Sequence, residues 1–556
     1  MGIFEEQVSQ FAPGTQDAAS RRWIYVPYDR LTDATGPLAE QAAEKTGIVM
    51  MEALAKARRR PYHKKKLALI VAGQRHFALE QGRRGVKVIY EFTPGIFADG
   101  LEQAVERHGL RELTMMEAAE RELRLDVEEA QRRGVPLKVV RDTTWCSTAE
   151  DFDGVFKPGT TQFLMDRFYR RMRQKTGILM GGDGQPVGGK YSFDVENRKP
   201  YRGEPRVPAR PVFAQDAITR EALETVEKEF REHFGTLEGF DLPVTQTDAD
   251  ALWAFVLREL LPHFGPYEDA MAEAEPDLFH SKLSAVINVG RLLPGRLVED
   301  VAKAAESGRV PLASAEGFIR QILGWREFMR HLHRRTDGYR RLPGGKVAAD
   351  GDAYAGSEIS ALNATLPLPA AYWGRKSGLH CVDVVVEQVW REGWSHHITR
   401  LMVLSNLATL CGVSPRELTD WFWIAYVDAY DWVVEPNVLG MGTWADGGVT
   451  ATKPYVSGAA YIHRMSDYCG QCGFDPKKTT GKDSCPFTAL YWSFLERNAD
   501  KLASNRRMSL PLMSMRKKPA AEMRQLRERA AEAMVTLCGA KNKANNEANK
   551  EANKER

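Results

Sequence analysis

Two hydrophobic patterns divide the chain. Up to residue 149, short apolar runs alternate with stretches of helical spacing, which predicts parallel strands joined by helices. The predicted strands cover residues 23–26, 48–51, 67–71, 87–90, 113–116 and 137–140. From residue 249 onward, apolar positions recur at helical spacing and strand signals are few. We therefore predict an α/β domain with a parallel sheet, followed by an all-α domain.

One segment of the second half carries much of the candidate chemistry. Helices are predicted over residues 252–261, 316–331, 383–411, 416–430 and 506–539. Within 378–402 no proline interrupts the chain, and four side chains share one helical face: Trp390, Trp394, His397 and Leu401. Spacing alone favours a core helix with a buried histidine, and a ligand-facing helix is the alternative.

The division into domains follows the same patterns and the composition. We predict a mobile leader over 1–21, the α/β domain over 22–149, a linker with a long loop over 150–248, the helical domain over 249–510 and a charged extension over 511–556. The end of that extension, 541–556, is of low complexity and is predicted to be disordered.

Composition limits the class of protein. With 556 residues of which 43% are hydrophobic, the chain can bury two or more cores. A net charge of only +3 means that nucleic-acid binding requires local basic patches. Seven cysteines in a chain of this length do not indicate a disulfide scaffold. The sequence lacks a secretory leader and any apolar run of the roughly 18 residues that span a bilayer. We therefore expect a soluble cytoplasmic monomer.

Four cysteines have the spacing of metal ligands. Cys469 and Cys472 form a C-x2-C pair, Cys485-Pro follows after twelve residues, and Cys381 lies in the central segment. Three thiolates and a distant fourth can hold an iron–sulfur cluster or a zinc ion. The proline after Cys485 favours the cluster, because it fixes the backbone and shields the sulfur. Unconnected buried cysteines are the remaining interpretation.

Three motifs together resemble a known family. They are GWSHHITRLM (393–402), the cysteine set and NVLGMGTWADGG (437–448). In this combination the chain resembles the bacterial iron–sulfur branch of the photolyase/cryptochrome family, which includes prokaryotic (6-4) photolyases. The resemblance covers 22–510 and is strongest over 281–498. It implies a Rossmann-like antenna domain and an all-α FAD-binding domain, with a [4Fe-4S] cluster on the four cysteines.

The resemblance also implies a set of FAD contacts. FHSKLS (279–284) resembles the phosphate-binding signature, and Asp428 matches the acid at the polar edge of the flavin, where Arg326 is expected to pair with it. A plain buried ion pair is the alternative for these two residues. The expected cofactor-binding residues are Ser281, Lys282, Leu283, Ser284, Arg326, Arg400, Asp428, Asn437 and Met441.

The family implies light-driven repair of DNA. An excited, reduced FAD passes one electron to a flipped-out (6-4) pyrimidine–pyrimidone photoproduct. His397 matches the proton donor, and Tyr455 and Tyr461 match positions near the lesion. The second catalytic histidine of eukaryotic (6-4) photolyases falls on Leu401, and His396 is expected to be structural. A protonated His397 requires a nearby anion.

An aromatic relay is expected to reduce the flavin. Trp421 and Trp373 match two relay positions, but Phe422 replaces the tyrosine that is common between them. Phenylalanine oxidises less readily than tyrosine. We therefore expect a relay that reroutes through Trp423 or runs slowly.

A charged loop lies in the linker. Residues 188–200 resemble the interdomain loop of the family, so Lys190, Arg198 and Lys199 are expected to contact DNA phosphates. Acidic residues accompany them and give two interpretations, a Mg²⁺ site or solvated surface acids, of which the second is slightly favoured. These acids are Asp194, Glu196 and Asp269.

The antenna segment departs from the family. Lys56 and Arg59 replace the glutamate and tyrosine that contact a lumazine antenna in relatives, whereas Asp29 retains the acid of the first loop. These changes argue against the usual lumazine. The basic run 56–66 is then a solvated helix face or a site for an anion.

Two other functions are open at this point. A cryptochrome-like photoreceptor would use the same scaffold to sense blue light without repair. A nucleic-acid-binding protein with a cluster and no flavin is the third hypothesis. The motifs do not separate repair from light sensing.

Overall fold

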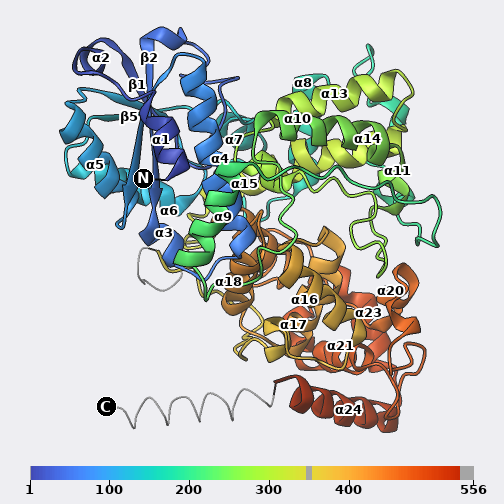
Figure 1. The fold of residues 1–556 in the computed structure, drawn as a ribbon. Helices are drawn as coiled ribbons and strands as arrows, with labels where there is room; N and C mark the ends of the chain where they lie inside the picture. Colours follow the sequence, from blue (N-terminus) through green and yellow to red (C-terminus); the bar gives the residue numbers. More distant parts are fainter. Residues whose placement is uncertain (1, 346–353, 539–556) are drawn as a thin grey trace, which may run out of the picture.

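The computed structural model describes residues 2–345 and 354–538. The chain forms an α/β lobe from its N-terminal part and a larger helical lobe from the rest (Figure 1). Five parallel strands form the sheet, in the order β3-β2-β1-β4-β5. They are β1 (Arg22–Tyr25), β2 (Thr46–Ala53), β3 (Lys87–Thr93), β4 (Leu113–Met116) and β5 (Leu137–Val140). The predicted α/β and all-α architecture is confirmed.

Helices cover both faces of the sheet. Along the fully buried strand β2, Ile48 and Met50 pack toward α4 (Lys64–Arg83), whereas Val49 and Met51 pack toward α5 (Phe97–His108) and α6 (Arg121–Arg132). A short α3 (Leu54–Arg58) follows the strand. A strand buried on both faces reads as a continuous apolar run, as in other parallel sheets.

The strand predicted over 67–71 is wrong, because this run belongs to α4. The helix is packed between the sheet and α9 (Ala217–Glu229), so most of its side chains are buried and its apolar residues are not confined to one stripe. A short apolar run in a buried helix cannot be told from a buried strand by periodicity.

The N-terminal segment is part of the α/β lobe. It forms α1 (Ile3–Ser9) and α2 (Thr15–Ser20), and the fully buried Phe4 packs edge-on against Tyr90 with ring centroids 4.7 Å apart. The predicted mobile leader is therefore wrong in this part.

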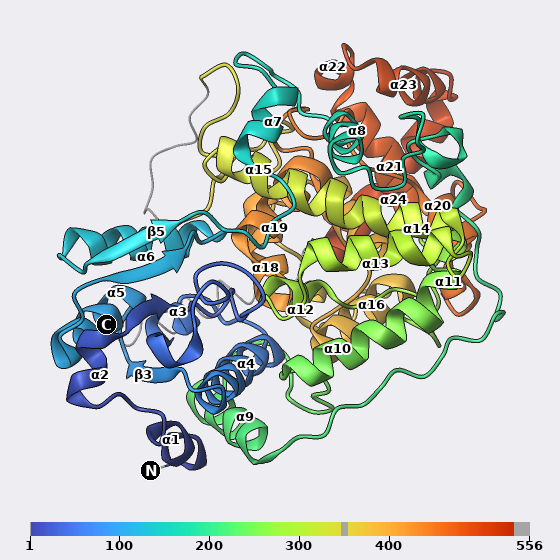
Figure 2. The same cartoon turned by 90° about the horizontal axis from the view of Figure 1, so that it is seen from above.

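The linker binds the two lobes together. Its first helices, α7 (Ala149–Val155) and α8 (Met165–Thr176), pack on the helical lobe. The chain then runs along the outer edge of that lobe and returns to α9, which packs on α4 (Figure 2). Two short 3-10 turns lie in the loop, Val187–Gly189 and Asp194–Glu196.

The helical lobe is interrupted by π-helical segments. Its α-helices are α10 (Gln246–Phe255), α11 (Leu261–Phe264), α12 (Ser284–Asn288), α13 (Pro294–Glu306), α14 (Leu312–Ile319), α15 (Glu327–Arg335), α16 (His380–Glu392), α17 (Asn406–Cys411), α18 (Pro415–Ala425), α19 (Asp431–Glu435), α20 (Ala459–Met465), α21 (Pro486–Arg497), α22 (Ala499–Leu502), α23 (Ser509–Arg516) and α24 (Ala520–Cys538). The π-helical segments are Val256–Leu260, Arg320–Arg326, Thr399–Ser405 and Pro436–Gly442. Such segments are frequent at functional sites.

The central segment is not one helix. Helix α16 ends at Gly393, whose φ of 62° lies in the left-handed region, and a Cβ there would meet Val427 Cγ1 at 2.7 Å. The prediction of one helix over 383–411 is therefore wrong. The break separates Trp390, which is exposed, from Trp394 and His397.

The C-terminal extension contains two helices rather than the single predicted one. Pro519 lies between α23 and α24, and a proline does not continue a helix from its preceding turn. The low-complexity residues 541–556 lie outside the described residues. Within the described ranges, we find no helix with the length and apolar character needed to cross a membrane.

Candidate functional site

A cleft in the helical lobe gathers the predicted cofactor residues. It contains about 1470 Å³ of space between protein atoms. All nine predicted residues line it: Ser281, Lys282, Leu283, Ser284, Arg326, Arg400, Asp428, Asn437 and Met441. His397 lies on the same lining. Three of the π-helical segments contribute to the wall, which brings residues far apart in sequence to one surface.

A bidentate ion pair lies in the wall of the cleft. Arg400 Nη1 and Nη2 donate to the two carboxylate oxygens of Asp428 at 3.0 and 2.9 Å. Ser284 Oγ donates to the same carboxylate at 2.6 Å. The predicted pairing of Asp428 with Arg326 is wrong, because Arg400 occupies both carboxylate oxygens.

Arg326 instead faces the cleft without an anion. Its guanidinium lies 3.9 Å from the ring centre of Trp145, and Nη2 donates to Asn288 Oδ1 at 3.3 Å. Nε and Nη1 are buried without a partner, and burial lowers the pKa of Arg326 to about 10. Buried polar groups are nearly always hydrogen-bonded, so this cation calls for a polar or anionic ligand.

The expected phosphate segment leads into α12. Lys282 has a φ of 56°, and its ammonium pairs with Asp277 at 2.9 Å. Leu283 N–H donates to Ser281 Oγ at 3.4 Å. The segment therefore places two hydroxyls and one paired cation on the cleft lining.

Three histidines meet beside this segment. The rings of His280 and His396 stack with centroids 4.4 Å apart, and His397 meets His280 edge-on at 5.5 Å. His280 Nε2 and both ring nitrogens of His396 are buried without a partner. Burial, reinforced by the neighbouring imidazoles, holds the pKa of His280 and of His396 well below the usual range. These two rings are therefore neutral.

The sequence identified His397 but missed His280. The only signal for His280 was its place directly before Ser281. His396, predicted to be structural, is buried as expected but also lines the cleft. The trio is the one group of histidine, cysteine or acidic side chains in the described residues that is compact enough to share a metal ion.

An acid lies next to His397. Asp269 Oδ1 is 3.6 Å from His397 Nε2, and Tyr461 OH donates to Asp269 Oδ2 at 3.4 Å. Burial and this carboxylate raise the pKa of Tyr461. The anion expected near His397 is therefore present. Tyr461 and Tyr455 are partly buried and lie outside the cleft lining.

The acidic and basic side chains of the loop 188–200 form ion pairs with one another. Asp194 pairs with Arg198 and, at 3.1 Å, with Arg320, and Glu196 pairs with Lys190. Arg198 Nε also lies 3.8 Å from Asp269 Oδ2. Lys190, Arg198 and Lys199 are exposed, as DNA contacts require. The three acids have basic or histidine partners and form no compact ligand group among the described residues, so this arrangement does not fit a divalent cation.

The four predicted cysteine ligands share one small cavity. Cys381, Cys469, Cys472 and Cys485 line it together with apolar side chains such as Ile462. None of these four forms a disulfide. Burial and the three other thiols raise the pKa of Cys381, and burial raises the pKa of Cys469 to about 11 and that of Cys485 to about 12.

The four thiols are not as close to one another as the ligands of a single zinc ion. Zn–S bonds of about 2.3 Å would bring the sulfurs within about 4 Å of one another. Among the described residues, the cysteines do not form a group that compact.

Comparisons with known proteins agree with this geometry. Residues 24–242 match the model of deoxyribodipyrimidine photo-lyase-related proteins, and residues 318–476 match the FAD binding domain of DNA photolyase. A (6-4) photolyase from Agrobacterium fabrum is 38% identical over 513 residues, which cover 90% of this chain and 97% of that protein.

The chain belongs to the photolyase family. Two solved structures share its fold. A bacterial class III photolyase from Agrobacterium tumefaciens has a TM-score of 0.55 at 15% identity, with 93% of this chain and 97% of that chain covered. A cryptochrome from Synechocystis has a TM-score of 0.53 at 16% identity, with 91% and 93% covered.

Of the predicted relay residues of this photolyase-family chain, Phe422 and Trp421 are neighbours at the wall of the cleft. Phe422 lines the cleft, and its ring lies 5.2 Å from Trp421. Trp421 is buried, and Trp373 is 43% exposed. Trp423, the predicted detour, lies elsewhere: the guanidinium of Arg60 covers its ring at 3.8 Å.

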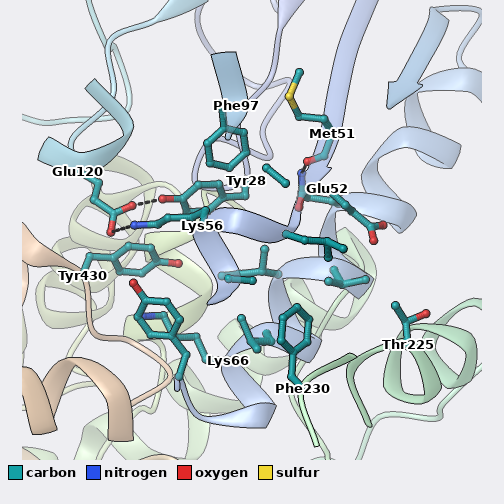
Figure 3. Close-up of a pocket in the computed structure, with 18 residues that line it drawn as sticks. Tyr28, Met51, Glu52, Lys56, Lys66, Phe97, Glu120, Thr225, Phe230 and Tyr430 are labelled. Carbon is teal, nitrogen blue, oxygen red and sulfur yellow. Dashed lines mark hydrogen bonds and ion pairs between the residues drawn. The ribbon is translucent and has the colours of Figure 1, made fainter. Parts of the chain in front are cut away.

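A second cavity lies in the α/β lobe, beside the carboxyl ends of β1 and β2 (Figure 3). Its walls are mostly apolar, with Met51 and Phe97 near the strands and Phe230 opposite. At one end, Glu120 accepts hydrogen bonds from Tyr28 OH and, at 3.0 Å, from Lys56 Nζ. Ligands of open parallel sheets bind at such carboxyl ends.

The basic run is buried and paired. Lys56 contacts Glu120 and Glu122, and Arg59 contacts Glu122 at 3.1 Å and Asp126 at 3.7 Å. Burial strongly lowers the pKa of Lys66, which donates to a backbone carbonyl. The prediction of a solvated helix face is wrong, because acids after β4 and on α6 fold back over this run. Asp29 is buried beside Arg30 and lies outside the cavity lining.

Proposed function

We propose that this protein repairs (6-4) pyrimidine–pyrimidone photoproducts in DNA, driven by light and by reduced FAD. The observation that carries the proposal is the cleft, in which nine predicted cofactor residues and His397 share one lining. The relative named (6-4) photolyase, at 38% identity, supports the choice of lesion. No specific observation favours the light-sensing alternative.

The residues of the cleft fit FAD. Arg326 has two buried donor atoms without partners, and the Arg400–Asp428 pair offers both a donor and an acceptor. Ser281 and Ser284 provide hydroxyls for the phosphates. A reduced FAD bound here would supply, after absorbing light, the electron that splits the lesion.

His397 would supply the proton that the lesion needs. It lies at the exposed rim of the cleft, with Nε2 facing Asp269. We therefore assign Asp269 to His397 and not to a divalent cation, and we place Tyr461 and Tyr455 beside the lesion, where Tyr461 orients Asp269.

We also propose a [4Fe-4S] cluster on Cys381, Cys469, Cys472 and Cys485. The cluster would join α16 to the loop that precedes α21. Lys190, Arg198 and Lys199 would contact DNA phosphates near the lesion, and these contacts would weaken with salt. We propose that the protein acts as a monomer in the cytoplasm, where its free cysteines stay reduced.

The cavity of the α/β lobe should not take the usual lumazine. Lys56 lies on its lining, with its charge neutralised by two glutamates of the chain. The glutamate that contacts a lumazine in relatives is replaced at this position by Lys56.

One experiment tests the repair proposal. The purified protein, reduced under anaerobic conditions, is incubated with an oligonucleotide that contains one (6-4) photoproduct, in blue light and in the dark. We expect restored pyrimidines in the light only. Flavin photoreduction without restored pyrimidines would support the photoreceptor, and repair in the dark would contradict both.

A further inference from the structure

The break at Gly393 leaves one tryptophan of the central segment outside the cleft. Trp390, on α16, is 43% exposed, the same fraction as Trp373. Of the twelve tryptophans, all within the described ranges, these two are the exposed ones. They line one open groove together with Arg375, Lys376 and Glu387. A dissolved reductant therefore meets both indoles at the same place.

A single buried ring connects these two indoles to the interior. Phe234, which follows α9 in the linker, contacts Trp390 with centroids 4.7 Å apart, Trp373 at 6.0 Å and Trp421 at 6.5 Å. All three contacts are edge-to-face, with interplanar angles of 70°, 73° and 87°. Two backbone hydrogen bonds attach Phe234 to the α/β lobe: Phe234 N–H donates to Pro61 O at 3.2 Å, and Lys64 N–H donates to Phe234 O at 2.9 Å.

The geometry is that of a fork. From the cleft, Phe422 leads to Trp421 at 5.2 Å, and Trp421 leads to Phe234. Beyond Phe234 the path divides between two surface indoles, and the branch to Trp390 has the shorter ring contact. Indole oxidises readily and benzene does not, so the phenylalanines act as bridges between tryptophan stations.

Trp423 is unsuited to the same role. The guanidinium of Arg60 lies 3.8 Å from its ring centre, and Arg60 is itself held as a cation by Glu122. A positive charge on the indole would be repelled by this neighbour in a buried setting of low dielectric. Oxidation of Trp423 is therefore disfavoured, and the predicted route through Trp423 is not a good alternative to Phe422.

We propose that Trp390 is a second surface terminus of the electron relay, in parallel with Trp373. This inference rests on the proposed flavin chemistry. In each event one electron passes from Trp421 to the excited oxidised flavin. An electron from Trp373 or Trp390 then refills Trp421. A thiol in solution reduces the surface indole. After two events two thiols have become one disulfide, and the two electrons and two protons that they released would have converted the oxidised flavin to its fully reduced form.

The test compares single and double variants of the flavin-loaded protein. The rate of flavin photoreduction is measured under blue light with excess dithiothreitol for Trp373→Phe, Trp390→Phe and the double variant. Each single change should slow the reaction only about twofold, whereas the double change should slow it about tenfold or more, because parallel routes are not additive. Trp423→Phe is the matched control and should leave the rate unchanged.

A second readout follows the indoles themselves. The wild type is illuminated in air without thiol, and oxidised tryptophan is mapped by peptide mass spectrometry. We expect oxidation at both Trp373 and Trp390, and increased oxidation at either one when the other is phenylalanine. A Trp373→Phe variant as slow as the double variant, with no oxidation at Trp390, would overturn the fork.

Failure of the fork and failure of the proposed function differ in these assays. Repair by chemically reduced protein bypasses the relay, so all four variants should repair (6-4) DNA as the wild type does. Absence of repair in every protein, with the fork pattern intact, would reject the repair function alone. A wild type that does not photoreduce would reject the fork.

Discussion

The flavin cleft and the cavity of the α/β lobe differ in whether their buried polar groups have partners within the chain. In the cleft, Arg326 and the histidines His280 and His396 keep buried nitrogen atoms without partners. In the α/β cavity, Lys56 is neutralised by Glu120 and Glu122. Unpaired buried polar atoms are costly, so the cleft is built for a ligand that completes it. In the α/β cavity, the glutamates of the chain already occupy the place that a ligand's acceptor would take beside Lys56.

The largest expected effect concerns the proton donor at the rim of the cleft. His397→Ala should lower the yield of (6-4) repair by about 100-fold or more, the usual contribution of a general acid. Its FAD content should not change, because His397 lies at the exposed rim. The yield is measured per absorbed photon on reduced protein. His463→Ala, on α20 and outside the cleft, is the control. Normal repair by His397→Ala would remove His397 from the mechanism.

A change in the cavity should affect stability and not the flavin. Glu122→Gln removes the charge that Lys56, Arg59 and Arg60 share, and breaking a buried pair costs about 3 kcal/mol or more. Urea unfolding measures the loss. Glu128→Gln, exposed on the same helix, should cost far less. Equal stability of the two variants would mean that the cavity is not held by its own charges.

Ligand addition distinguishes the two regions directly. At 100 times its dissociation constant, FAD should stabilise the flavin-free protein by about 2.7 kcal/mol, since it binds the folded state only. The lumazine antenna of relatives should give no shift in the midpoint of thermal unfolding. Stoichiometric lumazine in the native protein, identified by mass, would show that Lys56 leaves room for it.

Acid should weaken the cavity first. Burial alone would raise the pKa of Glu122, but Lys56, Arg60 and Arg59 outweigh it and hold that pKa well below the ordinary 4.5. A depressed folded-state pKa gives stability that is present above pH 4.5 and is lost as the pH falls below it. The free energy of unfolding should fall by about 1.4 kcal/mol per pH unit from this group, and Glu122→Gln should lose that part of the slope. An unchanged slope in the variant would assign the acid sensitivity to other carboxyls.

Much of the cleft could be predicted from the sequence because its residues lie in short motifs. The SKLS segment and Arg400 are each recognisable within a few residues, and the structure brings them together as expected. Which arginine forms the ion pair with Asp428 could not be predicted in the same way. The motifs suggested Arg326 as the partner of Asp428, whereas the fold brings Arg400 to both of its carboxylate oxygens.

The fold was predictable where periodicity was clear and failed where burial was complete. The five strands alternate with helices and were found, whereas the buried run 67–71 in α4 had the composition of a strand. The basic run 56–66 looked solvated because its acidic partners, Glu120 and Glu122, are about 60 residues away in sequence. Contacts of this range depend on topology and not on local pattern.

Gly393 separates α16 from the segment that carries His396 and His397, and the chain changes direction there. A side chain at position 393 would collide with Val427 and His63, so glycine is required where the chain turns between these two segments. The exposed Trp390 lies on one side of this turn, and Trp394 and His397, which line the cleft, lie on the other. A larger residue at position 393 would displace both segments, so it would alter the exposure of Trp390 and the lining of the cleft together.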